Sequence, residues 1–306
     1  MKSKIREWLP AIAFTLCTIV WGSTWLAIKF GYDSMPPLNA AALRFVIASS
    51  IFFAIQGIAR VPAPRGAAEW GVVLFVGIIW MGFDYGFIYW GEQHLASGLT
   101  SVLFATMPLF TLAVAVPLGL ESFTLRKIVG MITAIVGVAV LSWDQLGLGA
   151  ATLAPVAAIL GGSICSAVTT TVSKKWGTRI HPVALNANAS AIGCLVLYGG
   201  ALALGEGVRT PSTRAGWLCI VYLAVVGSVV TFLLYFWLLR HWDATRCGLI
   251  SVLTPILAVA LGSIVRDEPV TAHLVAGSAL VLAGVFLAMR PARAATPARS
   301  TGAAAR

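Results

Sequence analysis

The chain has 306 residues, of which 59% are hydrophobic and 10% are charged, and its formal net charge is +10. A soluble globular domain carries about 25% charged residues, so this composition excludes an ordinary soluble domain and indicates an integral membrane protein. The positive charge lies mainly in the connections on one side of the predicted membrane spans, so it is a topology signal and we expect no nucleic-acid partner.

Ten apolar segments follow one another along the chain, each close to the roughly 20 residues that cross a bilayer as a helix. They cover 9–29, 38–57, 69–90, 97–119, 125–143, 152–174, 183–204, 214–239, 244–265 and 271–289. The connections are short, so we predict an all-α integral membrane protein with ten transmembrane helices in the lipid bilayer. The composition of 291–306, rich in Pro, Ala, Ser, Thr and Arg, predicts a disordered cytoplasmic tail.

The 21 Lys and Arg residues are unevenly divided between the two sides of these spans. With the N-terminus inside, four lie at outer ends, Arg44 lies within a span, and the remaining sixteen lie at cytoplasmic ends; the outer four are Lys29, Arg209, Arg214 and Arg266. Cytoplasmic loops carry the excess of positive residues, so we place both termini in the cytoplasm. The first apolar run is too long for a signal peptide and lacks a cleavage site, so we expect it to remain.

A spaced signature occurs twice, and its two copies are 147 residues apart (255 − 108 = 147). It consists of Pro108, Glu121, Gly130 and Gly137, and then of Pro255, Glu268, Gly277 and Gly284. In the earlier spans an offset of 145 pairs Lys29 with Lys174. Ten spans divided into two copies give five each, and an odd number forces the second copy to cross in the opposite sense. We therefore predict inverted five-helix repeats over 1–147 and 148–290.

The first span carries Trp21, Trp25 and Lys29 on one helical face, with Ser23 and Thr24 beside it. Further aromatic and hydroxyl side chains lie well inside later spans: Trp80, Tyr85, Ser163, Ser166 and Tyr235. Apart from Lys29, these residues are our candidates for substrate binding in a central cavity near the bilayer midplane. The alternative is ordinary packing between helices. An aromatic cavity with few charges suits an amphipathic, near-neutral solute.

Two ionisable residues lie inside predicted spans, where charges are costly and functional by default. Arg44 and Asp84 each lie six residues below the outer end of their span, roughly 9 Å deep at 1.5 Å per residue. Equal depth makes a mutual ion pair plausible, either as a static lock on helix register or as a gating or protonating group. Lys29 at the outer end of the first span is a third candidate, or it extends toward the headgroups.

Pro108 and Pro255 lie near the middle of the fourth and ninth spans. A proline inside a helix removes a backbone hydrogen bond and kinks the helix, so this pair predicts two hinges. Proline is also simply more frequent in membrane helices, which is the alternative interpretation. For the repeated glycines we expect close helix packing and no chemistry.

Catalytic and cofactor motifs are missing from the sequence. There is no Walker A loop and no HExxH, and the five cysteines lack metal-ligand spacing, so we expect no catalytic residue, no metal site and no cofactor. The energy for transport must then come from a solute gradient, an ion gradient or exchange. Two other functions stay open, an intramembrane enzyme and a passive channel.

Residues 9–290 resemble the EamA-type members of the drug/metabolite transporter superfamily. The resemblance rests on Trp21-Gly22-Ser23-Thr24-Trp25, on Arg44-Phe45 and on the doubled Pro–Glu–Gly–Gly series. It implies an inner-membrane secondary carrier, often an exporter, of amino acids, other metabolites or toxic compounds. The aromatic spans suit aromatic amino-acid exporters of the YddG type.

The expected mechanism is alternating access with a small-molecule substrate in the central cavity. We expect its walls to come from spans one, three, six and eight, with two and seven contributing, while spans four and nine bend at the prolines. We expect the protein to work as a monomer.

Overall fold

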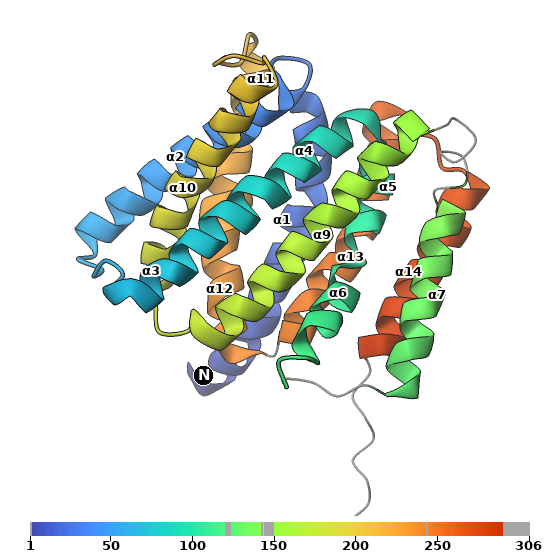
Figure 1. Cartoon of the computed structure of the whole chain (residues 1–306), viewed down its shortest axis with the longest axis horizontal. Coiled ribbons are helices and arrows are strands. Elements are labelled where there is room, and N and C mark those ends of the chain that lie inside the picture. The colour runs from blue at the N-terminus through green and yellow to red at the C-terminus, as the bar shows by residue number, and fades with distance from the viewer. Residues whose placement is uncertain (1, 120–123, 142, 144–149, 243, 290–306) are drawn as a thin grey trace, which may run out of the picture.

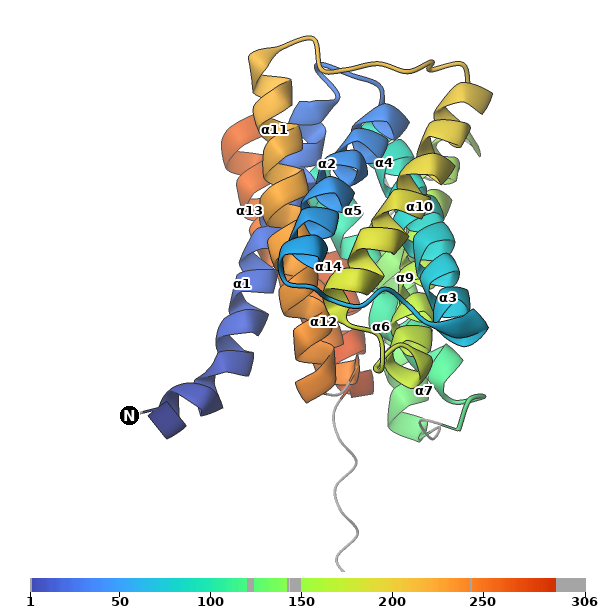
Figure 2. The ribbon, with the colours of Figure 1, turned by 90° about the vertical axis from the view of Figure 1, so that its left-hand side faces the viewer.

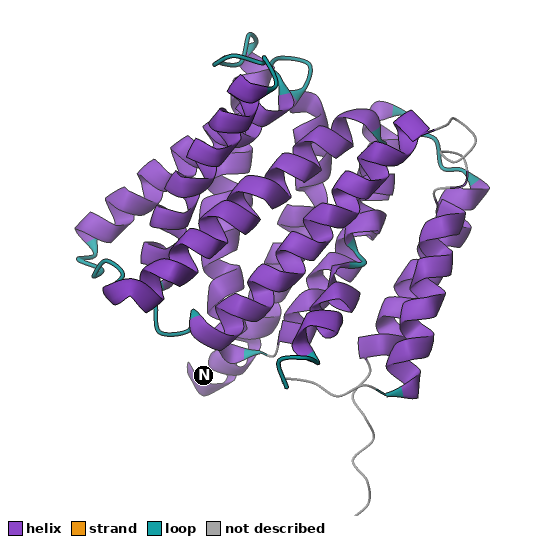
Figure 3. Cartoon of the chain, viewed as in Figure 1, coloured by secondary structure: helices purple, strands orange, loops and turns teal. Residues whose placement is uncertain are grey.

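The computed structural model describes residues 2–119, 124–141, 143, 150–242 and 244–289. These residues form helices joined by loops and turns, with no strand among them (Figure 3). Glu121 of the repeated signature and the expected tail over 291–306 lie outside the described residues.

The helices follow the predicted spans in order. They are α1 (Lys2–Gly31), α2 (Pro37–Ile58), α3 (Gly66–Phe75), the π-helix η1 (Val76–Asp84), α4 (Tyr85–His94), α5 (Ser97–Phe104), α6 (Met107–Ala115), α7 (Leu125–Leu141), α9 (Ala150–Trp176), α10 (Pro182–Ala203), α11 (Arg214–Ala224), the π-helix η2 (Val225–Val230), α12 (Thr231–His241), α13 (Ala244–Arg266) and α14 (Ala272–Met289). Because α3–η1–α4, α5–α6 and α11–η2–α12 are each one pass, the described residues make ten passes through the bundle.

Eight of these passes are long and apolar enough to cross a membrane, and Ala272–Ala288 is a shorter apolar helix. The remaining pass, α7, has 17 residues. Successive passes alternate in direction, so the N-terminus and the last residues of α14 lie at the same end of the bundle (Figures 1 and 2). We name this the near end, and we name the end at which α1 and α4 finish the far end. The prediction of a ten-helix all-α membrane protein is confirmed.

Helices α7 and α14 lie side by side at one edge of the bundle (Figure 1). Their closest approach is at glycines: a Cβ added at Gly130 would lie 2.5 Å from the carbonyl oxygen of Gly284, and one added at Gly284 would lie 2.5 Å from that of Gly130. The same antiparallel pairing continues from Gly137 to Val281. Small residues let helix backbones approach closely in a membrane. The packing role expected for the repeated glycines is confirmed.

The third and eighth passes contain π-helical segments at matching positions. The 147-residue offset places η2 on residues 78–83, which lie inside η1. A π-helix is rare and costs regular hydrogen bonding, and it is often found at functional sites. Both repeats therefore distort the same pass at the same depth.

The two repeat-related prolines differ in their local structure. The chain leaves the helical path at Ala105 and Thr106, between α5 and α6, and Pro108 lies in the first turn of α6. Helix α13 instead runs through Pro255 without interruption. The expected symmetry of these two sites is therefore not seen, and the hinge role of each proline stays a prediction.

Two glutamates of the second repeat bind helix N-termini of the first repeat at the far end. The Glu206 carboxylate accepts hydrogen bonds from Asn39 N at 3.2 Å and Asn39 Nδ2 at 3.0 Å, at the start of α2. The Glu268 carboxylate accepts from Ser97 N at 3.1 Å and Ser97 Oγ at 2.7 Å, at the start of α5. A carboxylate stabilises a helix N-terminus through its unpaired N–H groups and dipole. These bonds join the repeats at the far end.

We expect Gly130→Ala to destabilise the protein because its new Cβ would collide with the Gly284 backbone. Overpacking of this kind costs about 1–3 kcal/mol. Gly199→Ala is the matched control, since it lies on the exposed side of α10 with no atom within 4 Å of an added Cβ. Thermal unfolding in detergent measures both variants. A Tm for Gly130→Ala equal to that of Gly199→Ala would contradict the assigned packing.

Candidate functional site

A cavity of about 80 Å³ lies inside the bundle between the two repeats. Nine of the residues predicted from sequence line it: Trp21, Thr24, Trp25, Arg44, Trp80, Asp84, Tyr85, Ser166 and Tyr235. Ten further lining residues are Ile28, Ile88, Phe104, Met107, Thr170, Cys247, Gly248, Ile250, Ser251 and Thr254. Small-molecule sites usually measure roughly 300–1,000 Å³, so this conformation holds the cavity in a contracted form.

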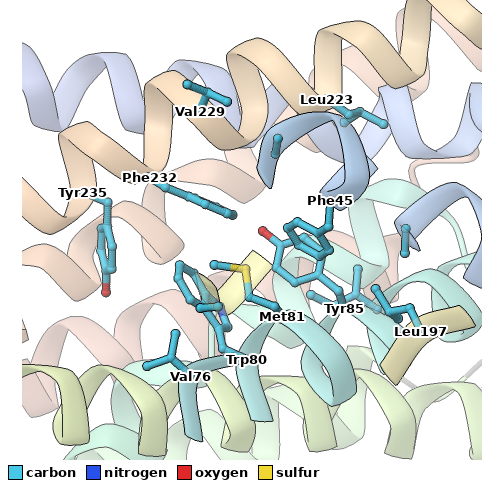
Figure 4. Close-up of a cluster of buried hydrophobic side chains, with 14 of the residues drawn as sticks. Phe45, Val76, Trp80, Met81, Tyr85, Leu197, Leu223, Val229, Phe232 and Tyr235 are labelled. Carbon is cyan, nitrogen blue, oxygen red and sulfur yellow. The ribbon is translucent and has the colours of Figure 1, made fainter. Parts of the chain in front are cut away.

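Aromatic rings from both repeats form one wall of the cavity. Trp80 and Tyr85 face Phe232 and Tyr235 across the cluster (Figure 4). The ring centroids of Trp80 and Phe232 are 4.9 Å apart, and those of Trp21 and Tyr235 are 5.1 Å apart. Tilted and edge-to-face ring contacts of this kind add stability beyond their buried area. The wall is therefore a packed aromatic surface that presents ring faces and edges.

The Arg44 guanidinium is fully buried and donates three hydrogen bonds, none of them to a carboxylate. Nε donates to Ser228 Oγ at 2.8 Å, Nη1 to Tyr89 Oη at 3.4 Å, and Nη2 to Gly227 O at 3.1 Å. The Ser228 hydroxyl in turn donates to Leu223 O at 3.1 Å, which leaves its lone pairs for Arg44. Neutral partners thus satisfy the arginine without cancelling its charge.

The rings beside Arg44 add electrostatic stabilisation. Its Cζ atom lies 4.8 Å from the ring centroid of Tyr85 and 5.8 Å from that of Phe45. A guanidinium over an aromatic face gains roughly 0.5–2 kcal/mol from the ring quadrupole, with the larger value in a desolvated site. These contacts hold a cation in the cavity wall while keeping the wall apolar.

The π-helix η2 places its backbone against the first repeat. The Gly227 carbonyl accepts hydrogen bonds from Trp21 Nε1 at 3.3 Å and from Arg44 Nη2. A Cβ added at Gly227 would lie 3.0 Å from Thr24 Cγ2 and 3.4 Å from Arg44 Nη2. A side chain at residue 227 would push Thr24 and Arg44 back, so the glycine favours this close approach of α1 and α2 to the carbonyl. The π-helical turn and its glycine therefore connect the two halves at the cavity.

Asp84 closes η1 and points toward α9 rather than toward Arg44. Its Oδ2 accepts a hydrogen bond from Ser166 Oγ at 2.8 Å, whereas its buried Oδ1 has no hydrogen-bond partner. The side chain is 1% exposed. A buried carboxyl oxygen without a donor is costly and is a strong acceptor for any donor that enters.

The prediction of an ion pair between Arg44 and Asp84 is wrong. Arg44 bonds to η2 and to Tyr89, and Asp84 bonds to α9, so the two charged groups leave their helices in different directions. Equal depth in the membrane does not fix rotation about the helix axis. The cavity wall therefore holds one guanidinium and one carboxyl group that are not paired with each other.

Three other sequence candidates lie outside the cavity lining. Ser23 Oγ shares a hydrogen bond of 2.6 Å with Tyr222 Oη, and Ser163 Oγ donates to Phe104 O at 3.4 Å. Lys29 lies near the far end and directly follows the lining residue Ile28 in α1. Ser23 and Ser163 thus bond to other helices, and none of the three meets the cavity in this conformation.

The walls also differ from the expected set of spans. Five lining residues come from α13, which was expected only to bend, and none comes from α10, the seventh span. The sequence held a signal for α13: Ser251 and Thr254 are hydroxyl residues one turn apart in the middle of an apolar helix. Phe104 and Met107 flank the break before Pro108, so the fourth span also reaches the cavity.

Curated relatives match almost the whole chain. An archaeal protein of Archaeoglobus fulgidus named an uncharacterized transporter is 27% identical over 287 residues, covering 94% of this chain and 99% of the relative. A protein of Escherichia coli named the uncharacterized inner membrane transporter YedA is 28% identical over 269 residues, covering 85% of this chain and 84% of the relative. A probable amino-acid metabolite efflux pump of Escherichia coli is 26% identical over 282 residues, covering 89% and 92%.

A solved crystal structure shares the fold, with a TM-score of 0.69 and 17% sequence identity over 91% of this chain and 96% of the other. The model of the EamA-like transporter family matches this chain twice, over residues 8–143 and 153–290. The two matches together cover most of the sequence and follow the two halves of the bundle. The chain belongs to the EamA-like transporter family.

Proposed function

We propose that this protein is a secondary transporter that exports neutral amino acids, with aromatic or other apolar side chains, by alternating access. One observation carries the proposal: Arg44 and Asp84 both line the aromatic cavity between the repeats, and they are not paired with each other. A zwitterion supplies both missing partners at once. An amine or an acid alone would leave one buried charge unmatched.

The Arg44 guanidinium suits the carboxylate of an amino acid. A guanidinium has five N–H donors, and three of them are in use here, which leaves two for a ligand. Charge-assisted hydrogen bonds between a guanidinium and a carboxylate are roughly twice as strong as neutral ones. The arginine is already buried by the fold, so most of the cost of removing it from water is met before a carboxylate enters.

The Asp84 carboxyl suits the ammonium group. Its free Oδ1 can accept from an ammonium N–H while Ser166 Oγ holds Oδ2 in place. Burial of two opposite charges is favourable only when each finds a partner with good geometry. The aromatic rings of Trp80 and Tyr85 lie close to both groups and would contact the amino-acid side chain.

Alternating access is supported by the contracted cavity and by the irregular segments around it. A cavity of about 80 Å³ must widen to admit an amino acid. The π-helices and the break before Pro108 lie at the cavity, where a change of backbone hydrogen bonding would move its walls. An Escherichia coli relative named as a probable amino-acid metabolite efflux pump also favours amino acids and export.

For the membrane orientation we propose that the near end faces the cytoplasm and that both termini are therefore cytoplasmic. The support is the excess of Lys and Arg in the connections of that end. The name of the relative YedA favours the inner membrane.

The orientation can be tested with fusions after Arg306. We expect a fluorescent protein fused there to be bright and an alkaline phosphatase fused there to be inactive in a bacterial host. Alkaline phosphatase fused after Ser212, in the loop before α11, should be active instead. The reverse pattern would show that the near end faces outward.

The substrate is tested by comparing phenylalanine with its two half-charged analogues, phenethylamine and phenylpropionate, in liposomes. We expect saturable counterflow of labelled phenylalanine and weaker competition by each analogue. A zwitterion should gain about 1.4 kcal/mol or more over each analogue, which is at least about tenfold in affinity. A passive channel would show no counterflow, and an enzyme would convert the solute.

Asp84→Asn tests the acidic half of the site. It should weaken phenylalanine binding about tenfold or more while leaving phenylpropionate unaffected, because Asn keeps the shape but loses the charge. The control is Asp33→Asn, in the exposed turn that follows α1. Equal losses for both ligands, or no loss for either, would contradict the assigned role of Asp84.

A further inference from the structure

A second buried carboxyl group lies one helical turn beyond the lining residue Ile88, on the far-end side of the cavity, and takes no part in the proposed substrate site. Glu92, in the last turn of α4, is 0% exposed, and neither of its carboxyl oxygens has a hydrogen-bond partner. An ionised carboxylate buried without a donor is strongly unfavourable. The acid is therefore held in a place that favours its neutral, protonated form unless a cation approaches.

The charged groups that face Glu92 come from two other segments. Lys29 on α1 and Glu268 in the connection from α13 to α14 are both near enough to act on it electrostatically, and the ring hydroxyls of Tyr32 and Tyr89 are also close. Glu268 is already engaged, because it binds the N-terminus of α5 through Ser97 and Gly98. Arg266, which also lies near Lys29, is paired with Asp33 at 3.3 Å. Lys29 is thus the cation left to pair with Glu92, and no ion pair within 4.0 Å joins Lys29 and Glu92 in this conformation.

The inverted repeat shows what a lysine does at this position. Lys174, the repeat partner of Lys29, donates from Nζ to Leu239 O at 2.5 Å and to Trp242 O at 3.2 Å, at the end of α12. In the alignment of the two repeats with the 147-residue offset, Leu239 is equivalent to Glu92 (239 − 147 = 92). At the near end a lysine therefore fastens its helix to the end of the neighbouring pass.

At the far end the equivalent position carries an acid in place of Leu239. No hydrogen bond from Lys29 Nζ to the end of α4 is present among the described residues, in contrast to Lys174. The near-end contact uses backbone carbonyls, which do not titrate. The far-end contact has a carboxyl group that does, so only this end of the transporter can respond to protons in this way.

We propose that Glu92 and Lys29 form a proton-binding site that controls the far end of the bundle. A proton bound to Glu92 leaves Lys29 without a carboxylate partner, as in this conformation. Loss of that proton to the outer solution leaves an anion, which draws the Lys29 ammonium into an ion pair and fastens α1 to α4. Opening at the far end then depends on the pH outside the cell, and the proton is the ligand of this site.

The effect on export rests on the proposed transport function and on the far end facing outward, whereas protonation of Glu92 does not. Export is measured in membrane vesicles of both orientations, with the pH on one side of the membrane varied and that on the other side fixed. We expect the export rate of phenylalanine to rise as the pH at the far end falls, and to depend little on the pH at the near end.

Glu92→Gln is the decisive variant because glutamine imitates the protonated acid. It should export at the fast rate that the wild type reaches at low outer pH, and the several-fold dependence on outer pH should disappear. Lys29→Met should also abolish the dependence, since no ion pair can form. Glu69→Gln, a half-buried acid in the first turn of α3, is the matched control and should keep the wild-type dependence.

Two results would overturn the proposal: Glu92→Gln with the outer-pH dependence of the wild type, or a pH-independent Glu92→Gln locked at the slow rate. Infrared difference spectroscopy of the purified protein supplies a readout without transport. The C=O stretch of a protonated carboxylic acid should be present in the wild type and in Asp84→Asn, and it should be reduced in Glu92→Gln. An unchanged band in Glu92→Gln refutes the proton site even if no amino acid is transported.

Discussion

The buried positive charge of Arg44 is the constraint on which the cavity depends. An isolated ion inside a protein costs several kcal/mol even after relaxation, and here no carboxylate offsets that cost. The partners are instead a hydroxyl, a phenol, a backbone carbonyl and a ring face, and two of them, Ser228 and Gly227, belong to the π-helix of the other repeat. The hydrogen bonds that stabilise the buried charge therefore also join the two repeats, and they leave a positive charge in the cavity wall.

The repeat symmetry separates scaffold from site. Close glycine contacts between α7 and α14 and π-helical segments in both halves are shared, as expected for mechanics common to the two directions of opening. The residues of the site are not shared between the repeats. In the alignment of the repeats, Asp84 is equivalent to Thr231 and Trp80 is equivalent to Gly227 (231 − 84 = 147; 227 − 80 = 147). The first repeat has the indole of Trp80 at this position. The second repeat has Gly227, whose carbonyl oxygen accepts hydrogen bonds from Trp21 and Arg44.

Hydropathy and the repeated signature were enough to predict the ten passes and the helix packing, because both follow from local composition. The pairing of Arg44 with Asp84 was predicted wrongly, because depth along a helix says nothing about the direction of a side chain, and a π-helix shifts that direction without a sequence signal. Glu92 was missed because it stands near the end of its pass, where an acid usually reaches water. The sequence nevertheless contains a signal for this pair. Lys29 and Glu92 each lie two residues before the last residue of a helix that finishes at the far end.

A crystal structure with a bound neutral amino acid would show whether Arg44 and Asp84 together bind a zwitterion. We expect a widened cavity with the ligand carboxylate on the Arg44 guanidinium and the ammonium on Asp84, while Ser228 and Gly227 keep their bonds to the arginine. A ligand bound elsewhere, or a direct ion pair between Arg44 and Asp84 in the bound state, would contradict it.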